Sequence, residues 1–422
     1  MKKPINIDLV PNFEYDDFEI IDKLLKNYSF DFENLEEKAK KFLFTYFPNT
    51  EIYFFNSARS ALSFLLENID TRINTNVLKT QINASNIRRD PHILTQAFSC
   101  LVVPNAIKFA GFQPLYIDID ESFNLNIDDL KNKINETTKA IIIQNTFGIP
   151  AKIEEILNIA KKNNLLIIEN LTHSLGAKYK GVYLGNFGDF VLLSFNRNKV
   201  ISAITGGALI VRNKNFNEKI RQKYQELPDL DSKEIKKTLF TGKILYKAKE
   251  NYNFLMKIYL KFLRTKNFTL EMVSSLEKQG KQPKNYLAKF PKILFPLLVN
   301  QLNKLERFNE QRKKIAQIYI AAGLKNFTIN NDSEPIFLRF PIFSQNPDKV
   351  LEKFKKQNIY LGDWYRCVLA PCSNIENFAY KLGTCPKAEN VSRKLLNLPT
   401  HPNINEQQAQ TIINLLQKYN YI

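Results

Sequence analysis

The sequence of 422 residues is poor in cysteine and histidine and has no long apolar run. Its 4 cysteines show no C-x-x-C spacing, and only 3 histidines accompany them. This pattern predicts neither a zinc site nor a disulfide framework, and it favours the reducing environment of the cytoplasm. No run of about 18 apolar residues is present, which argues against a transmembrane helix. The N-terminal basic pair is not followed by an apolar stretch, so we expect no secretory signal.

The net charge is the most unusual feature of the composition. The 60 Lys and Arg residues outnumber the 42 Asp and Glu residues, which gives +18 at pH 7. A nucleic acid, an acidic membrane surface or an anionic substrate can each account for such an excess. No nucleic-acid-binding motif accompanies the charge, so we expect no nucleic-acid partner.

Short apolar segments alternate with amphipathic ones between residues 54 and 212. The expected strands are 93–98, 114–119, 140–144, 165–169, 190–195 and 207–211, and the expected helices are 58–67, 103–110, 127–134 and 153–163. Alternation of this kind predicts β-α-β units and a mostly parallel sheet. Residues 70–90 are polar without periodicity, and we interpret them as a surface insertion.

The pattern changes twice after this region, which suggests how the chain is divided. It is largely helical from 215 to 324 and mixes strand and helix from about 335 to the end. We therefore expect an α/β protein with five parts. They are an N-terminal arm (1–45), a large domain (46–228), a basic amphipathic helical insertion (229–292), a connecting helix (293–330) and a small α+β domain (331–422).

Residues 233–292 carry much of the charge excess, with 15 Lys and Arg against 4 Asp and Glu. Within this segment Phe254, Ile258 and Phe262 recur at helical spacing, while Lys257 and Lys261 fall mainly on the other side. Such a helix can lie in an anionic membrane interface, which would bring a cytoplasmic protein to the inner face of the membrane. It can equally pack its apolar stripe on the core of the protein, because periodicity does not separate the two.

Three motifs in the large domain place reactive groups next to strand ends. Residues 55–62, Phe-Asn-Ser-Ala-Arg-Ser-Ala-Leu, form a strand-to-helix turn whose free N–H groups suit a phosphate. Residues 166–177 lead an apolar strand into polar groups at the carboxyl edge of the sheet, where α/β proteins bind ligands. Residues 194–199 end in Lys199, which can form a Schiff base if its amine is partly desolvated.

Together these motifs resemble the DegT/DnrJ/StrS family of pyridoxal-phosphate sugar aminotransferases, in particular a subgroup with SARSAL and HSLGA signatures. Further matching strings are AGFQPLYIDID at 110–120, QNTFGIPA at 144–151, GNFGD at 185–189 and LPTHP at 398–402. The resemblance implies PLP fold type I, with a mostly parallel seven-stranded sheet and a homodimeric assembly. It also implies that an amino group passes from an amino acid, which we expect to be glutamate, to a nucleotide- or lipid-linked keto sugar.

The resemblance also assigns roles to individual residues. Lys199 matches the lysine that holds the cofactor and moves protons. Ser60 and Ser194 match the cradle of the cofactor phosphate, and Arg59 lies in the same turn, where it can add a charge-assisted hydrogen bond. Lys289 matches a cation that reaches the phosphate bound by the neighbouring subunit. The resemblance implies no metal.

Three further positions depart from the usual pattern of the family. Cys100 stands where many relatives place an aromatic ring over the pyridine, and His173 replaces a glutamine that contacts the ring hydroxyl. Asn170 replaces an aspartate whose charge keeps the ring nitrogen protonated, so the ring becomes a weaker electron sink. The alternative function is therefore a catalytically impaired paralogue that binds a membrane or a partner.

Overall fold

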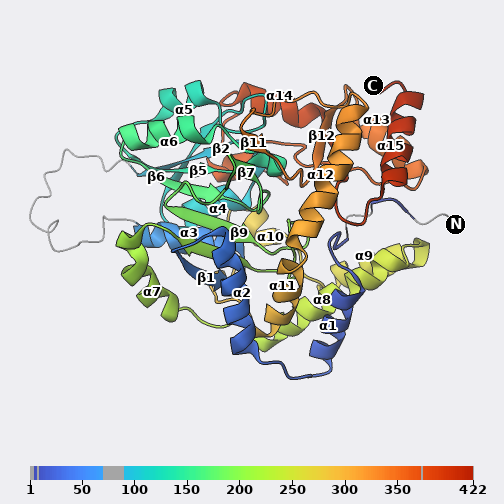
Figure 1. Ribbon diagram of the computed structural model, residues 1–422, viewed down its shortest axis with the longest axis horizontal. Helices are drawn as coiled ribbons and strands as arrows, with labels where there is room; N and C mark the ends of the chain where they lie inside the picture. The colour runs from blue at the N-terminus through green and yellow to red at the C-terminus, as the bar shows by residue number, and fades with distance from the viewer. Residues whose placement is uncertain (1–3, 7–8, 70–89, 372–373, 422) are drawn as a thin grey trace, which may run out of the picture.

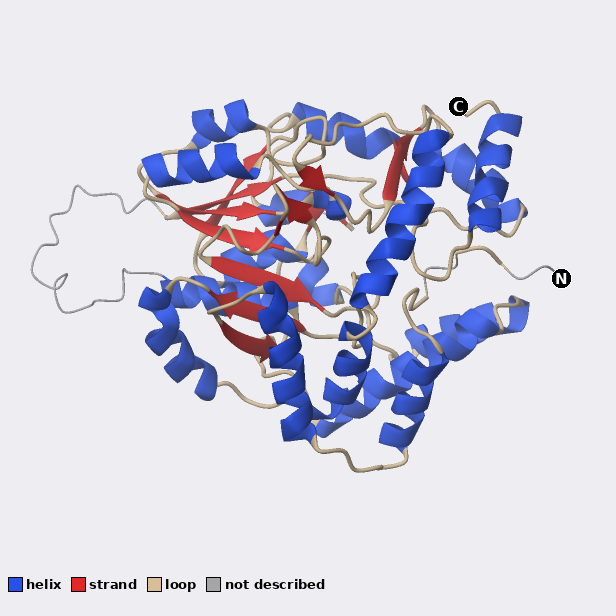
Figure 2. Ribbon diagram, in the orientation of Figure 1, coloured by secondary structure: helices blue, strands red, loops and turns tan. Residues whose placement is uncertain are grey.

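The computed structural model describes residues 4–6, 9–69, 90–371 and 374–421, and within it a central seven-stranded sheet organises the fold (Figures 1 and 2). The strand order is β1 (Glu51–Phe55), β10 (Gly207–Val211), β9 (Phe190–Ser194), β6 (Leu166–Asn170), β5 (Thr138–Ile143), β2 (His92–Gln96) and β4 (Gln113–Ile117). Neighbours from β9 to β4 are parallel, whereas β10 runs antiparallel to β9 and to β1. This confirms the predicted fold class.

Helices cover both faces of the sheet, as the alternation of its buried side chains requires. In β5, Ile141 and Ile143 join one apolar cluster, while Ala140 and Ile142 join another on the opposite face. The first face is covered by α1 (Tyr15–Leu25), α2 (Phe32–Tyr46), α5 (Ile127–Lys133), α6 (Ile153–Lys162) and α11 (Phe295–Leu302). The second is covered by α3 (Ala58–Ile69), α4 (Val102–Phe109) and α7 (Asn217–Gln225).

The strands and helices predicted between residues 54 and 212 all overlap observed ones, and the predicted strand 207–211 coincides with β10. The predicted insertion at 70–90 lies outside the described residues except for Asp90. Three short pairings complete the region around the sheet. They involve β3 (Ser99–Cys100) with β13 (Leu369–Ala370), β7 (Lys178–Tyr179) with β8 (Val182–Tyr183), and β7 with β11 (Ser333–Glu334).

A third apolar cluster forms around the C-terminal part of the chain. Its elements are α12 (Leu305–Ala321), β12 (Phe340–Phe343), α13 (Pro347–Lys356), α14 (Pro386–Lys394), β14 (Leu395–Leu398) and α15 (Glu406–Lys418). Strand β12 pairs antiparallel with β14. In the sequence α8 (Ser232–Glu250), α9 (Phe254–Thr265) and the short α10 (Ser275–Lys278) come between these two regions, and the buried apolar residues of α8 and α9 join the first apolar cluster.

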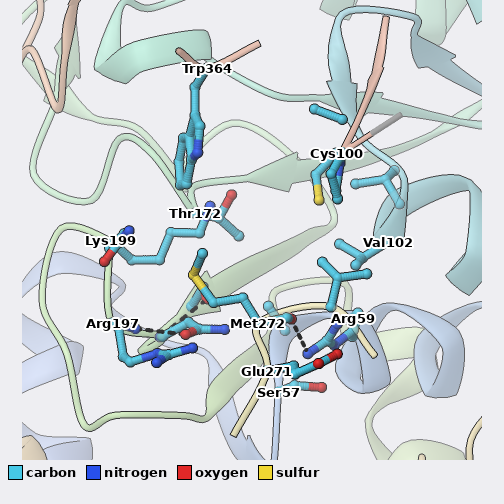
Figure 3. A pocket seen from close by; sticks show the side chains of 18 of the residues that line it. Ser57, Arg59, Cys100, Val102, Thr172, Arg197, Lys199, Glu271, Met272 and Trp364 are labelled. Carbon is cyan, nitrogen blue, oxygen red and sulfur yellow. Dashed lines mark hydrogen bonds between the residues drawn. The ribbon is translucent and has the colours of Figure 1, made fainter. Parts of the chain in front are cut away.

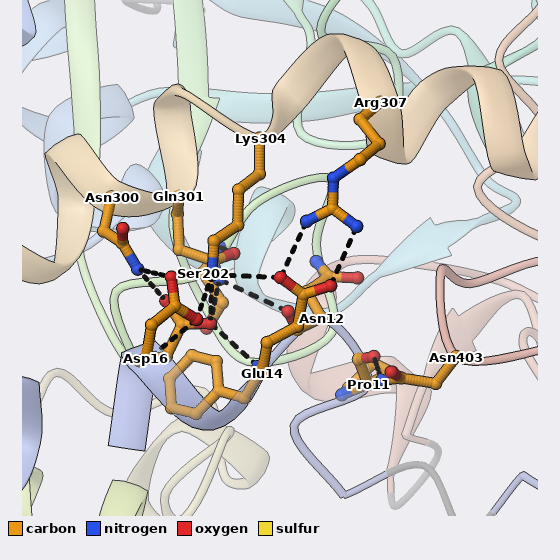
Figure 4. Close-up of polar contacts among 12 residues, drawn as sticks. Pro11, Asn12, Glu14, Asp16, Ser202, Asn300, Gln301, Lys304, Arg307 and Asn403 are labelled. Carbon is orange, nitrogen blue, oxygen red and sulfur yellow. Dashed lines mark hydrogen bonds and ion pairs between the residues drawn. The ribbon is translucent and has the colours of Figure 1, made fainter. Parts of the chain in front are cut away.

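Buried polar contacts fasten α1 to α11 and α12 (Figure 4). Asp17 is fully buried and accepts hydrogen bonds of 2.9 Å from Gln301 Nε2 and of 2.9 Å from Lys304 Nζ. Gln301 in turn accepts a 3.1 Å hydrogen bond from the backbone N–H of Ser202. The N-terminal segment is thereby fixed against the loop between β9 and β10, which contains Lys199.

The structure also tests the expectations about a transmembrane helix and about the cysteines. Among the described residues, no helix is both long and apolar enough to cross a lipid bilayer. Cys367 is disulfide-bonded, whereas Cys100 and Cys385 are free, so the expectation that the cysteines form no disulfide is wrong for Cys367. The cause is that a disulfide requires two Cα atoms within about 7 Å of each other, and this distance is compatible with spacings other than C-x-x-C.

Candidate active site

A cavity of about 650 Å³ opens at the carboxyl ends of β6 and β9. Residues from several distant parts of the chain line it, among them Ser57, Cys100, Asn170, Lys199 and Trp364. Figure 3 shows Trp364 above the Lys199 side chain, with Cys100 and Arg59 across the cavity. Ligands of parallel α/β sheets bind at this edge because the loops that follow the strands converge there.

Lys199 lies in the loop after β9 with its Nζ 5.0 Å from the centre of the Trp364 ring. Burial lowers the pKa of the Lys199 amine to about 8, and the positive charges of Arg339 and Arg59 add to the effect. A free lysine has a pKa near 10.5, so this amine is uncharged in a far larger fraction of molecules at neutral pH. An uncharged amine is a nucleophile and a proton acceptor.

The turn between β1 and α3 offers a site for an anion. Ser57 and Ala58 line the cavity at the start of α3, where the first N–H groups of a helix have no partner inside the helix. Gly207 allows β10 to pack closely behind this turn, since a Cβ there would stand 2.4 Å from the Ala58 nitrogen. Ser60 is fully buried, donates to the Ser57 carbonyl at 2.8 Å, and does not line the cavity.

Arg59 lines the cavity but uses its guanidinium to hold the 269–278 segment. Its Nη1 lies 2.6 Å from Glu277 Oε1, and its Nη2 donates to the Met272 carbonyl at 2.9 Å. Arg197 makes a similar contact, from Nη2 to the Leu270 carbonyl at 3.1 Å. The two arginines therefore fasten this segment over the cavity, and residues 269–273 form part of its wall.

Asn170 is the last residue of β6 and lines the cavity. Its Oδ1 accepts a 3.2 Å hydrogen bond from the backbone N–H of Thr172. The side-chain nitrogen of Asn170 must then lie on the opposite side of the amide, where it can donate. Ser194 and Cys100 line the same cavity, and burial raises the pKa of the Cys100 thiol, which favours its protonated form.

His173 is buried beside the cavity rather than in its wall. Its Nδ1 accepts a hydrogen bond from the Phe147 N–H at 3.4 Å, and its Nε2 lies 3.3 Å from the Tyr365 hydroxyl. Its ring stacks on Trp364 with centroids 5.8 Å apart. Burial lowers the pKa of His173 well below its ordinary value, so the ring is neutral. His173 therefore packs against the Trp364 ring, which itself lines the cavity.

Lys289 does not line the cavity of its own chain. Its Nζ donates to the Gln225 carbonyl at 3.0 Å and lies 5.8 Å from the centre of the Tyr224 ring. Its backbone joins the edge strand β1 through a bridge with Phe55. The assignment of Lys289 to a neighbouring subunit therefore stays a prediction.

The structure adds cavity residues that the motifs had not assigned a role. Thr172, Arg197, Arg264 and the 269–273 segment all line the wall, and Trp364, which the sequence left between core and cavity, does so as well. Thr172 and Arg197 lie within the motifs at 166–177 and 194–199, so their positions in the sequence could have indicated that they line the cavity. Arg264 and the 269–273 segment come from the helical insertion, and no local pattern indicates that they fold back onto the sheet edge.

Positive charges outnumber negative ones in the cavity wall. Six lining residues carry positive charge, namely Arg59, Arg197, Lys199, Arg264, Lys278 and Arg366, and two carry negative charge, Glu271 and Asp363. The donor set fits pyridoxal phosphate: a helix start for a phosphate, a lysine of lowered pKa for an aldehyde, and the amide of Asn170 for a ring nitrogen. The described residues of the wall thus suit this cofactor and an anionic substrate.

Comparisons with known proteins agree with this chemistry. The model of the DegT/DnrJ/EryC1/StrS aminotransferase family matches residues 67–244 and 263–417. GDP-perosamine synthase of Escherichia coli O157:H7 is 23% identical over 349 residues, which cover 82% of this chain and 83% of that protein.

Solved structures show the same fold. PseC of Helicobacter pylori, an aminotransferase involved in the biosynthesis of pseudoaminic acid, superposes with a TM-score of 0.67 at 20% identity and covers 96% of each chain. The PLP-form of a putative sugar aminotransferase of Streptococcus pneumoniae gives a TM-score of 0.70 at 17% identity and covers 99% of this chain and 97% of that one. The chain therefore belongs to the DegT/DnrJ/EryC1/StrS aminotransferase family and is a pyridoxal-phosphate-dependent aminotransferase.

Proposed function

We propose that this enzyme transfers the amino group of glutamate to a keto sugar carried on a nucleotide or on a lipid. The observation that carries the proposal is Lys199, whose pKa falls to about 8 inside a cavity with more positive than negative side chains in its wall. Relatives named for GDP- and UDP-linked sugars support a nucleotide-linked substrate, among them a UDP-N-acetyl-3-dehydro-α-D-glucosamine 3-aminotransferase of Acidithiobacillus ferrooxidans. A sugar linked to a lipid through phosphate has the same anionic chemistry.

Different residues of the cavity would have different roles in such a transfer. Pyridoxal phosphate, when bound, supplies the carbonyl that takes up the amino group and a conjugated ring that accepts electrons. Lys199 would hold the cofactor and release it to the amino donor, and its free amine would then carry a proton from the α-carbon of the donor to the carbonyl carbon of the cofactor. The Ser57–Ala58 turn receives the phosphate. The cationic wall attracts the carboxylates of glutamate and the phosphates of the sugar carrier.

Asn170 favours a second candidate function, that of a catalytically impaired paralogue that binds a membrane or a partner. Its side-chain amide donates a hydrogen bond without supplying charge, so it pairs with an unprotonated ring nitrogen. A neutral ring withdraws electrons less strongly, which slows proton removal from the amino donor. The retained Lys199 and its lowered pKa favour the active enzyme, because a binding protein has no use for them.

A cofactor titration tests the proposal. Purified protein with added pyridoxal phosphate is expected to develop a visible absorbance band, and borohydride is expected to fix the cofactor on Lys199. Lys199→Ala should abolish the band, whereas Lys381→Ala, at an exposed lysine far along the chain, should leave it unchanged. Glutamate should then bleach the band of the intact enzyme.

The outcomes separate the two candidate functions. A band that glutamate bleaches supports the aminotransferase, and amination of a nucleotide- or lipid-linked keto sugar identifies the acceptor. A protein that binds no cofactor overturns the proposal. A protein that binds the cofactor on Lys199 but reacts with no amino acid supports the impaired paralogue.

The proposal includes a homodimer in which Lys289 reaches the phosphate bound by a second copy. Its support is that Lys289 lies outside the cavity of its own chain, next to the edge strand β1. Lysine provides charge without the two-pronged geometry of arginine, so we expect its contribution to be modest.

A further inference from the structure

The outer face of α9 exposes an apolar stripe. Phe254 and Leu255 are each 74% exposed, and Ile258, Tyr259 and Phe262 continue the stripe toward the end of the helix. Among the described residues of α9 only Leu260 and Leu263 are buried. The alternative in which the apolar stripe packs on the core therefore fails for these five residues. Soluble proteins seldom expose so many large apolar side chains together without a partner.

Contacts on the inner side hold this face outward. Leu260 and Leu263 pack into the core, and Lys257 Nζ donates to the Tyr360 hydroxyl at 2.9 Å. The Lys257 ammonium also lies 5.0 Å from the centre of the Tyr252 ring. In Figure 1 α9 lies at the edge of the molecule, with one end projecting past its neighbours. The stripe is thus presented to the surroundings on an anchored helix.

Basic residues accompany the stripe, and acidic ones are absent from it. Lys257, Lys261, Arg264 and Lys266 lie in or just after α9, and the chain carries no Asp or Glu between Glu250 and Glu271. Lys261 and Lys266 are exposed. A helix with this combination of exposed aromatic, aliphatic and cationic side chains suits the boundary between headgroups and acyl chains of an anionic lipid bilayer.

A groove of about 560 Å³ continues the stripe toward α8. Tyr259 and Phe262 belong to both surfaces, and Phe240 and Phe268 add further rings. Lys236 and Lys237 of α8 also line the groove. The groove therefore combines apolar and cationic side chains, as the stripe does. Its four aromatic rings suit a lipid acyl chain, and its two ammonium groups suit a lipid phosphate.

We propose that the α9 face, together with this groove, docks the enzyme on an anionic lipid surface. A second copy of the chain is the main competing occupant, because the stripe is apolar. A symmetric contact through α9 would bring Lys261 and Lys266 of one copy near the same lysines of the other, and like charges repel. An anionic bilayer can contact the apolar stripe with its acyl chains and the cations with its headgroups.

Docking would set the active site close to the lipid surface. Leu260 and Arg264 of α9 line the catalytic cavity, so one helix forms both the docking face and part of the cavity wall. This placement suits a substrate held on a lipid carrier. The docking itself rests on the outer face of α9 and on the groove, and it does not depend on the aminotransferase reaction.

Vesicle co-sedimentation tests the proposal. The full-length protein is mixed at low salt with vesicles of phosphatidylcholine alone or with added phosphatidylglycerol. We expect binding to the anionic vesicles and little to the neutral ones. Phe254→Ser with Leu255→Ser should weaken binding on the order of tenfold, because both side chains lose their apolar contact with the bilayer. Lys261→Gln with Lys266→Gln should weaken it roughly 25-fold at low salt.

Matched controls use exposed residues far along the chain. Leu382→Ser replaces a side chain that is 68% exposed, and Lys325→Gln with Lys381→Gln removes two exposed charges. These variants should bind vesicles like the unchanged protein. Every variant should keep its melting temperature, because the substituted residues are exposed. Each should also take up pyridoxal phosphate normally, because none of these residues lines the cavity.

Several results would overturn the docking proposal. They are a lack of binding to anionic vesicles, equal binding to neutral ones, or binding that the α9 variants do not weaken. Sedimentation velocity adds one more: if Phe254→Ser with Leu255→Ser splits a dimer into monomers, the stripe belongs to a subunit interface. Failure of the vesicle test with intact cofactor uptake leaves the proposed reaction standing.

Discussion

The side-chain amide of Asn12 donates a 2.7 Å hydrogen bond to the backbone carbonyl of Lys199, 187 positions further along the chain. It also donates to the Val200 carbonyl at 3.1 Å, and its own oxygen accepts from Arg312 Nη2 at 3.0 Å. Arg312 is fully buried and donates a further 2.7 Å bond to the Val200 carbonyl. Two residues distant in sequence therefore fix the backbone that carries the catalytic lysine.

Removing this support should loosen Lys199. Asn12→Ala is expected to lower the free energy of unfolding by about 2 kcal/mol, because Arg312 and two backbone carbonyls lose a buried partner. It should also reduce kcat more than it raises KM, since the change displaces the lysine without touching the substrate. Urea denaturation and steady-state kinetics measure the two effects. The exposed Asn390→Ala serves as the control, and an unchanged kcat in Asn12→Ala would show that Lys199 does not need this anchor.

The amide of Asn170 should limit the rate at which glutamate passes its amino group to the cofactor. Asn170→Asp places a carboxylate against the ring nitrogen and favours its protonation, so the cofactor draws electrons more strongly. We expect glutamate to bleach the cofactor band at least about tenfold faster, which corresponds to 1.4 kcal/mol of barrier. Stopped-flow absorbance measures the rate, with Asn170→Ala as the comparison. A rate that stays the same in Asn170→Asp would mean that another step is limiting.

Buried His173 and half-buried His401 should make the protein sensitive to acid. Burial lowers the pKa of His401 to about 3, and it lowers the pKa of His173 well below 6.5. Between pH 6.5 and 3 the unfolded chain therefore binds more protons than the folded one, so stability falls as the pH falls through this window. Each histidine contributes a slope of up to about 1.4 kcal/mol per pH unit.

Denaturation in urea at pH 7, 6 and 5 measures this slope. His401→Asn should reduce it, because asparagine does not titrate. His92→Asn is a weaker control, since the pKa of His92 is lowered without so large a shift. An equal slope in the His401→Asn variant and the unchanged protein would contradict the assignment.

The ion pair between Arg59 and Glu277 should hold the 269–278 segment over the cavity. Glu277 is 3% exposed, so Glu277→Gln leaves the Arg59 charge without its partner and is expected to cost about 2 kcal/mol. The segment should then open more often and become easier for a protease to cleave. Glu271→Gln, an exposed position in the same segment, is the matched control. Identical cleavage rates in the two variants would show that the ion pair does not close the segment.

The proposed role of Lys289 predicts complementation between subunits. Lys289→Gln should weaken cofactor binding by about fivefold, because one exposed charge contact to the phosphate is lost. Mixing and refolding this variant with Lys199→Ala forms sites in which Lys199 comes from one copy and Lys289 from the other. Those sites should recover full affinity, which a cofactor titration detects. The exposed Lys281→Gln is the control, and a mixture that recovers nothing would contradict a shared site.

The basic amphipathic helix shows where a local pattern stops being informative. Its spacing and charge correctly indicated an amphipathic helix at α9, but they did not indicate which side faces the protein. The structure turns Leu260 and Leu263 inward and Phe254 and Leu255 outward. That choice depends on how α8 and α9 pack against the rest of the chain, and the helix period contains no information about it.

The sequence by itself determined the alternation of strands and helices, the α/β class and the motif that ends in Lys199. These features depend on neighbouring residues, because side-chain periodicity and turn chemistry act over a few positions. Tertiary structure alone decided that Asn12 and Arg312 hold the Lys199 backbone, that His173 stands behind Trp364, and that Arg59 pairs with Glu277. Such contacts join residues that are far apart in the chain, and they exist only once buried polar groups must find partners inside a packed core.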